Sequence, residues 1–186
     1  MNVHPPKVSL FATAIAAALV VSAPAFAREY IFLPPFESNT SGPIKGPVTE
    51  AGLEESIEIL SFQHELVNEL NAATGKTGIT TQHTVVTITK ELDRATPLLA
   101  DTLFKNGTIP SLTFMFFRTD PSGGKAESFS ITLEEAQVSQ IRLDKPNDRQ
   151  STTLEYVSFA YDKISWEEIP FGVMAFDSWR QTRRAR

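Results

Sequence analysis

The segment Leu112-Thr113-Phe114-Met115-Phe116-Phe117-Arg118 decides the fold class of this chain. Successive side chains of a strand point to opposite faces, so Phe114 and Phe116 share one face while Met115 and Phe117 share the other. Both faces are apolar, and both therefore need cover. A second layer of the protein can cover one face. A helix, a loop or a neighbouring subunit can cover the other, and the residues alone leave these alternatives open.

Alternation of apolar and polar residues continues on both sides of this segment. Runs of β-branched and aromatic residues bounded by turn residues predict strands. The predicted strands are residues 30–33, 82–90, 129–133 and 138–143, with a final hairpin of 153–161 and 163–168 around Asp162. Stretches rich in Gly, Pro, Asn, Ser or charge predict loops at 37–52, 71–81, 120–124 and 144–151.

Residues 95–106 form the clearest predicted helix. Thr96 is a good N-cap, Pro97 suits the first helical position, and Gly107 is expected just past the end. Two further features are expected of it: a buried stripe and an exposed ion pair four residues apart. The residues are Leu99 and Leu103 for the stripe, and Asp101 and Lys105 for the pair.

Residues 53–70 are ambiguous. Leucine, isoleucine and valine recur there near helical spacing, with glutamates between them, which favours a helix. Residues 56–62, however, alternate well enough for a strand. Periodicity alone does not choose between the two.

Composition excludes several classes of function. The 186 residues carry 17 basic and 22 acidic side chains, a net charge of −5. Nucleic acid is therefore not expected as a partner, because binding phosphates needs a basic surface. The chain has no cysteine, which excludes disulfides, thiol catalysis and cysteine-ligated metals.

The first 27 residues have the pattern of a secretory signal peptide. Lys7 provides the positive charge, an apolar run follows from Leu10 to Ser22, and Ala25-Phe26-Ala27 fits a cleavage site after Ala27. The alternative is an uncleaved N-terminal helix. The apolar run is too short to span a bilayer comfortably, so we expect no membrane association after cleavage. Arg183, Arg184 and Arg186 make residues 181–186 a basic tail.

No set of residues predicts a catalytic, cofactor or metal site. His64 and His83 are not spaced as ligands and are read as ordinary polar residues. Gly75-Lys76-Thr77 lacks the earlier glycine of a phosphate-binding loop, since position 70 is leucine. The acidic pairs at 54–55, 134–135 and 167–168 are read as solvated charge, because neighbours on a strand point to opposite faces. We therefore expect no enzyme activity.

Several segments in order resemble the type VI secretion tube protein, the hemolysin-coregulated protein family. Together they span nearly all of residues 30–180, and their order and spacing carry the resemblance rather than any one of them. The segments are SIEILSFQH (56–64), TITKELD (87–93) followed by TPL (96–98), ITLEEAQV (131–138), the run from 154 to YDKISW (161–166), and DSW (177–179).

The resemblance implies a mainly β fold in which two antiparallel sheets form a barrel over residues 28–180, with one packed helix at about residues 96–106. It also makes residues 56–64 a strand, against their helical periodicity. The family resemblance further implies homo-hexameric rings that stack into a hollow tube through a long loop, here residues 65–81. The lumen of such a tube can hold small effector proteins.

The signal peptide is the main departure from the family, because it predicts a secreted or periplasmic protein whereas family members are made in the cytoplasm and exported by the apparatus. The leading hypothesis is a self-assembling tube component that works in protein secretion. The alternative is a secreted or periplasmic monomeric binding module that keeps the barrel without tube assembly.

Phe116→Asp is expected to disrupt folding or assembly, because the charge would be buried without a partner. Soluble yield and native mass report the outcome. Retention of soluble rings in this variant would contradict the prediction.

Overall fold

The computed structural model describes residues 29–119 and 124–179. The predicted signal peptide (1–27), the basic tail (181–186) and most of the predicted turn at 120–124 lie outside the described residues. The described elements are β1 (Glu29–Leu33), β2 (Phe36–Ser38), β3 (Gly42–Ile44), β4 (Ile57–Ile59), β5 (Ser61–Gln63), β6 (Leu66–Asn71), β7 (Lys76–His83), β8 (Val86–Glu91), α1 (Thr96–Phe104), β9 (Thr108–Thr119), β10 (Lys125–Asp144), β11 (Leu154–Ala160), β12 (Lys163–Glu168) and β13 (Val173–Ser178).

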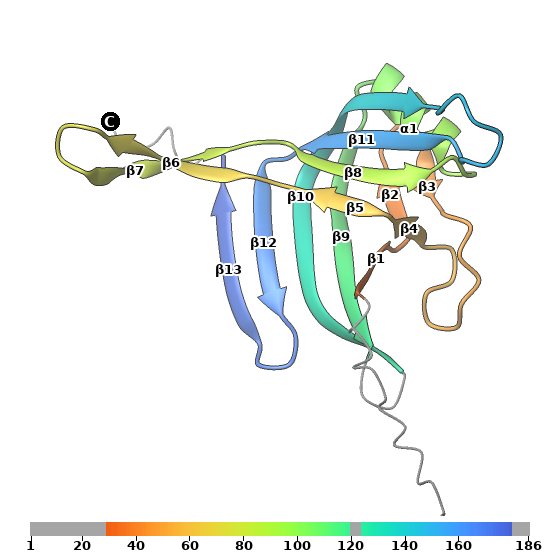
Figure 1. Ribbon diagram of the computed structural model, residues 1–186, viewed down its shortest axis with the longest axis horizontal. Coiled ribbons are helices and arrows are strands. Elements are labelled where there is room, and N and C mark those ends of the chain that lie inside the picture. The colour runs from red at the N-terminus through yellow and green to blue at the C-terminus, as the bar shows by residue number, and fades with distance from the viewer. Residues whose placement is uncertain (1–28, 120–123, 180–186) are drawn as a thin grey trace, which may run out of the picture.

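The core is one antiparallel sheet that folds over itself into two layers (Figure 1). The strand order is β4-β1-β9-β10-β11-β8-β5, and β12 and β13 continue from β10. The two ends of this order, β4 and β5, are consecutive in the chain with only Leu60 between them. The chain itself thus joins the ends of the sheet, and the predicted mainly β barrel with one helix is confirmed. The family resemblance implied one strand over residues 56–64, and the structure has two short strands there, β4 and β5, separated by Leu60.

Strand β10 belongs to both layers. Its first part pairs with β12 over 129–134, its last part pairs with β11 over 137–144, and β9 pairs with much of its length. Glu135, between the two parts, has a φ of 51°, a left-handed conformation that turns the strand. The separate strands predicted at 129–133 and 138–143 are therefore one bent strand.

The final hairpin predicted around Asp162 is wrong. Strand β11 pairs with β10 and β8, whereas β12 pairs with β10 and β13. Asp162 lies at a corner where the chain passes from one layer to the other. Strand β13 was not predicted, and the loop predicted at 37–52 contains the small pair β2–β3.

The two-faced strand packs its faces differently. Phe114 is fully buried, and its ring lies edge-on to Phe62 at 5.0 Å between centroids. Phe116 is half-buried against Phe62 and Phe129. On the other face, Phe117 lies edge-on to Phe32. The core comprises, among others, Leu33, Ile57, Ile88, Leu99, Leu133, Phe159 and Ile164.

Helix α1 begins differently from the expectation. Ala95 rather than Thr96 is the N-cap, without a side-chain cap bond. The Ala95 amide donates to Asp93 Oδ1 at 2.8 Å. The Thr96 hydroxyl donates instead to Glu155 Oε2 at 2.6 Å. The Thr96 hydroxyl therefore binds the buried Glu155 carboxylate instead of capping the helix, the role that its position in the sequence predicted.

The end of the helix also differs. Asn106, with a φ of 49°, takes the left-handed position predicted for Gly107. Gly107 serves a close approach, since a Cβ there would lie 2.1 Å from Thr40 Oγ1. Other expectations are confirmed: Leu99 is buried, Leu103 packs on the core, and Asp101 and Lys105 pair at 2.7 Å.

A fully buried ion pair joins the helix start to the sheet. Lys90 Nζ on β8 lies 2.7 Å from Glu155 Oε2 on β11 and 2.9 Å from Asp93 Oδ1. The ammonium also donates to the Thr96 hydroxyl at 3.1 Å. Both Lys90 and Glu155 are fully buried, so each ion depends on the other for compensation.

Lys90→Met is expected to destabilise the fold by about 3–5 kcal/mol, because it leaves the Glu155 carboxylate buried without its cation. Urea unfolding measures the change. The matched variant Lys90→Met with Glu155→Leu removes both charges and should recover most of the loss. A single variant as stable as the parent chain would show that the pair is not needed.

Candidate assembly surfaces

The segment predicted as a loop at 65–81 is an extended β-hairpin. Strands β6 and β7 pair with each other from Leu66↔His83 to Asn71↔Lys76, apart from the rest of the sheet. Figure 1 shows the hairpin projecting far beyond the barrel as a continuation of β5 and β8. The loop prediction for 71–81 is therefore wrong over Lys76–Thr81, which are strand. Their β-branched residues were the overlooked signal.

The hairpin exposes apolar side chains to solvent. All six residues of β6 are exposed, and Leu70 has 66% of its surface accessible. Leu66 and Val67 are the other exposed apolar residues of this strand. A two-stranded ribbon is marginal by itself in water, so this arm has the exposure of a segment that packs against another protein surface.

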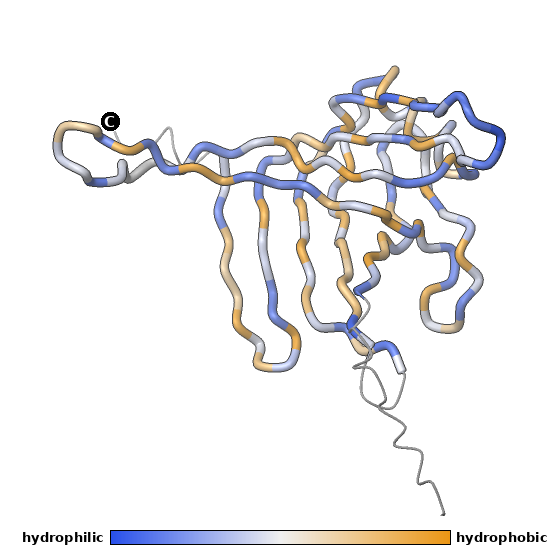
Figure 2. Tube along the Cα trace, in the orientation of Figure 1, coloured by the Kyte–Doolittle hydropathy of each residue, from blue (hydrophilic) through white to orange (hydrophobic). Residues whose placement is uncertain are grey.

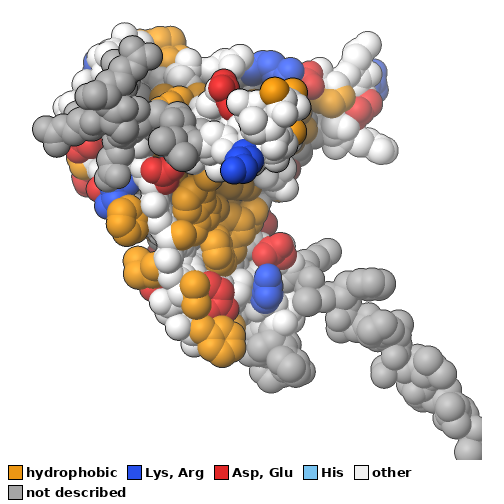
Figure 3. Space-filling model, turned by 90° about the vertical axis from the view of Figure 1, so that its left-hand side faces the viewer, with side chains coloured by type: hydrophobic (Ala, Val, Ile, Leu, Met, Phe, Trp, Pro, Cys, Tyr) orange, Lys and Arg blue, Asp and Glu red, His pale blue; other side chains and the backbone are white. Residues whose placement is uncertain are grey.

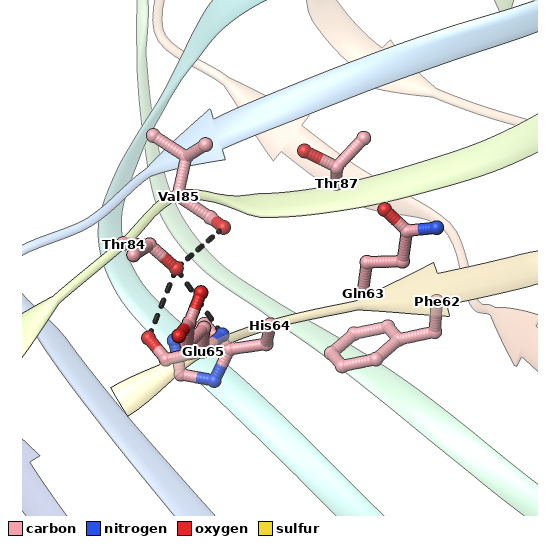
Figure 4. Close-up of a pocket in the computed structure, with 7 residues that line it drawn as sticks. All are labelled: Phe62, Gln63, His64, Glu65, Thr84, Val85 and Thr87. Carbon is pink, nitrogen blue, oxygen red and sulfur yellow. Dashed lines mark hydrogen bonds between the residues drawn. The ribbon is translucent and has the colours of Figure 1, made fainter. Parts of the chain in front are cut away.

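The hairpin joins the barrel at a short junction. The Glu65 amide and carbonyl both bond the Thr84 hydroxyl, at 3.1 Å and 2.9 Å. A cavity of about 500 Å³ lies beside this junction (Figure 4). Its lining residues are Phe62, Gln63, His64, Glu65, Thr84, Val85 and Thr87.

Two histidines, one just before β6 and one at the end of β7, both contact a single tyrosine. His64 Nε2 lies 2.7 Å and His83 Nδ1 lies 3.0 Å from the Tyr161 hydroxyl. His83 Nε2 lies 3.2 Å from Asp177 Oδ2 on β13. The sequence separations reach 97 residues, so no local pattern could have brought these side chains together. The prediction of ordinary polar histidines missed this cluster.

Burial shifts two pKa values in the cluster. Partial burial, with a smaller contribution from His83, lowers the pKa of His64 below its ordinary value of 6.5. Burial, with a smaller contribution from the Asp177 carboxylate, raises the pKa of Tyr161 well above its ordinary value. The phenol therefore keeps its proton at all physiological pH values.

Strand β13 forms a second exposed apolar surface. It pairs with β12 on one side, and no strand of the described chain pairs with its other side. Figure 2 shows apolar residues along this strand, and Figure 3 shows apolar side chains gathered on this side of the molecule. The exposed residues are Phe171, Val173, Met174 and Phe176, each with more than 60% of its surface accessible. An unpaired apolar edge is a pairing surface for another chain.

The remaining polar groups form no reaction centre within the described residues. Glu55 pairs with Lys45 and Glu134 pairs with Lys163, in accordance with their reading as surface charge. In residues 29–119 and 124–179, no group of three or more His, Asp or Glu side chains is placed to hold a metal ion. The same part of the chain contains no helix long and apolar enough to cross a membrane.

The fold and these surfaces define a β-barrel subunit with a projecting hairpin and an open apolar edge, both exposed to solvent. Residues 37–167 match the family model described as "Type VI secretion system effector, Hcp". The chain belongs to this family. It is accordingly a type VI secretion tube protein, a structural component that assembles with itself and with other secretion components, and not an enzyme.

Individual relatives agree with this assignment. The chain is 28% identical over 140 residues to a protein of Pseudomonas aeruginosa named "Major exported protein", covering 73% of this chain and 81% of the relative. A structure described as "Crystal structure of Hcp protein" matches with a TM-score of 0.75 at 28% identity, covering 82% of this chain and 99% of the other. The Hcp1 protein of E. coli EAEC 042 matches with a TM-score of 0.70 at 28% identity, over 81% and 97% of the two chains.

Phe176→Ser is expected to leave the stability of the isolated subunit within about 0.5 kcal/mol, because the ring is exposed. It should weaken self-association at least about tenfold, because the same ring would be buried in an assembly. Sedimentation over a concentration series measures association, and thermal unfolding measures stability.

Phe104→Ser is the matched control for that substitution. Phe104 has 81% of its surface accessible but lies at the end of α1, away from β13 (Figure 1). Equal weakening by both variants would mean that β13 has no special part in association.

Proposed function

We propose that this protein forms hexameric rings that stack into a hollow tube, with the β6–β7 hairpin making the contact between rings. The observation that carries the proposal is the hairpin itself: it projects from the barrel, and all six residues of β6 are exposed. In a stacked assembly this arm would lie on the next ring and gain the cover that it lacks in the subunit.

Closure into a ring would cover the second exposed surface, the free edge of β13. The free edge of β13 carries apolar side chains, and a soluble protein avoids leaving such an edge open. A head-to-tail interface that closes on itself hides one such edge in every subunit and leaves none at an end. Ring closure would therefore cover the apolar side chains that this edge exposes.

Export is part of the same proposal. Residues 1–27 would act as a signal peptide cleaved after Ala27, delivering residues 28–186 to the periplasm or the exterior. Residues 28–180 would then be the assembling domain, followed by the basic tail 181–186. Small effector proteins would be the cargo of the lumen. The exported relative in Pseudomonas aeruginosa supports secretion of this chain, whereas the route through a signal peptide rests on the residue pattern.

The native mass of residues 28–186, measured by size exclusion with light scattering, tests ring formation. A hexamer is the expected result. A monomer from micromolar to millimolar concentration would contradict the ring and favour a monomeric binding module with the same barrel.

Shortening the hairpin tests its part in stacking. Residues 69–80 replaced by Asn-Gly would join Asn68 to Thr81, which are opposite each other in the hairpin, through a tight two-residue turn. We expect rings of unchanged mass that no longer form long tubes in electron micrographs. Tubes of normal length from this variant would rule out the hairpin as the stacking contact.

A further inference from the structure

His64, Tyr161, His83 and Asp177 form what we call the junction cluster. The donor and acceptor in each of its hydrogen bonds can be assigned, and assembly alone does not explain this arrangement. A carboxylate only accepts, so His83 Nε2 donates to Asp177 and carries a proton. In a neutral His83 the other nitrogen, Nδ1, is then an acceptor, and the Tyr161 hydroxyl donates to it. The phenol has a single proton, so His64 Nε2 must donate to the phenol oxygen. One continuous chain runs from His64 through Tyr161 and His83 to Asp177.

This chain accommodates one additional proton but not two. If His83 Nδ1 gains a proton, it becomes the donor and the phenol oxygen becomes its acceptor. The phenol proton can then be donated to His64 Nε2, provided that the His64 ring carries its own proton on Nδ1. If both imidazoles are charged, both nitrogens donate to the phenol oxygen, and the phenol's own proton loses its acceptor. Two cations then also share one hydroxyl in a site where Tyr161 and His83 are buried, which raises the cost of their repulsion.

We propose that this cluster is a proton-operated latch, which holds the base of the β6–β7 hairpin on the barrel when at most one extra proton is bound and releases it when both imidazoles are charged. The latch regulates the hairpin, so its consequence for tube stacking rests on the function proposed above. Its mechanism concerns the single subunit.

The cluster lies where the hairpin joins the barrel, and it connects the hairpin to the core through Tyr161. His64 lies between β5 and β6, and His83 is the last residue of β7. The junction itself adds only the bonds between Glu65 and Thr84. Tyr161 belongs to the corner between β11 and β12, and Asp177 belongs to β13. The four side chains therefore connect the arm to two other parts of the sheet.

Other charged groups near the cluster do not compensate a second positive charge on the histidines. Asp177 is the carboxylate that faces His83, and it stabilises one positive charge there. Glu65 and Asp162 adjoin His64 and Tyr161 in the chain, and Lys163 on β12 is paired with Glu134 on β10. No described carboxylate bonds to His64, so a second positive charge would have no counter-ion within bonding distance there.

The direction of the pH effect follows from His64. Burial lowers its pKa below the ordinary 6.5, so the unfolded or released state binds the proton more strongly than the latched state. The latch therefore stabilises the attached hairpin fully above about pH 6.5. This stabilisation is lost as the pH falls through the lowered pKa of His64.

Hydrogen exchange with mass spectrometry on residues 28–186 tests the proposal, with protection corrected for the intrinsic effect of pH. Between pH 7.5 and 5.0 we expect protection at 64–68 and 81–84 to fall at least about tenfold while β9 and β10 remain protected. The chain's two tryptophans, Trp166 and Trp179, have ring centroids 6.0 Å from His64 and 5.8 Å from His83, so intrinsic fluorescence should follow the same transition.

Three variants separate the latch from a general effect of acid. His64→Gln keeps an N–H donor but cannot be charged, so it should stay protected at both pH values. Tyr161→Phe removes the shared hydroxyl and should leave the hairpin base unprotected at both. Glu127→Gln is the control, because burial raises the pKa of this carboxyl too yet it lies on β10. It should behave like the parent chain.

Unchanged hairpin protection at pH 5.0 in the parent chain, or an unchanged pH response in His64→Gln, would overturn the latch. The ring proposal is judged separately, by native mass at pH 7.5. A monomer with an acid-released hairpin would refute the ring and keep the latch, whereas a hexamer with a pH-independent hairpin would do the reverse.

Discussion

The pairing of β10 with three other strands is the constraint on which the rest of the structure depends. Strands β9, β11 and β12 all bond to it, and its bend at Glu135 divides the partners between two layers. An antiparallel sheet hides its backbone groups only when each strand has a neighbour on both sides. By bending, one long strand provides neighbours for both layers and lets a single sheet enclose a core. The positions of β9, β11 and β12 follow directly from this pairing.

The same constraint shows which surfaces remain open. The ends of the sheet meet through Leu60, so β4 and β5 are held by the chain itself. Strand β13 has no such closure, and the β6–β7 hairpin lies outside the sheet altogether. Both expose large apolar side chains. The subunit thus buries its core fully but leaves two surfaces with exposed apolar side chains. This is typical of a subunit whose surfaces are covered in an assembly.

The sequence predicted the elements that are determined by neighbouring residues in the chain. It missed the features that depend on contacts between residues far apart in the chain. The helix and the strand at 112–118 stand out because capping residues and alternation are local patterns. The bend of β10 was not predictable, because Glu135 is an unremarkable residue for a turn and its φ is imposed by the two layers. Thr96 failed as an N-cap for the same kind of reason: Glu155, 59 residues away, bonds its hydroxyl. The junction cluster draws on four separate segments, so only the fold assembles it.

The junction cluster gives the two open surfaces a common support. Tyr161 binds His64, which precedes β6, and His83, which ends β7, and Asp177 on β13 binds His83. The ring of Trp179, which follows β13, lies 5.5 Å from Tyr161 and 5.8 Å from His83. A movement of the hairpin base would therefore change the contacts that His83 makes with Asp177 and Trp179 at the apolar edge. Because coupling between two sites is reciprocal in free energy, the proposed ring contact at β13 and the proposed stacking contact at the hairpin would influence each other through this cluster.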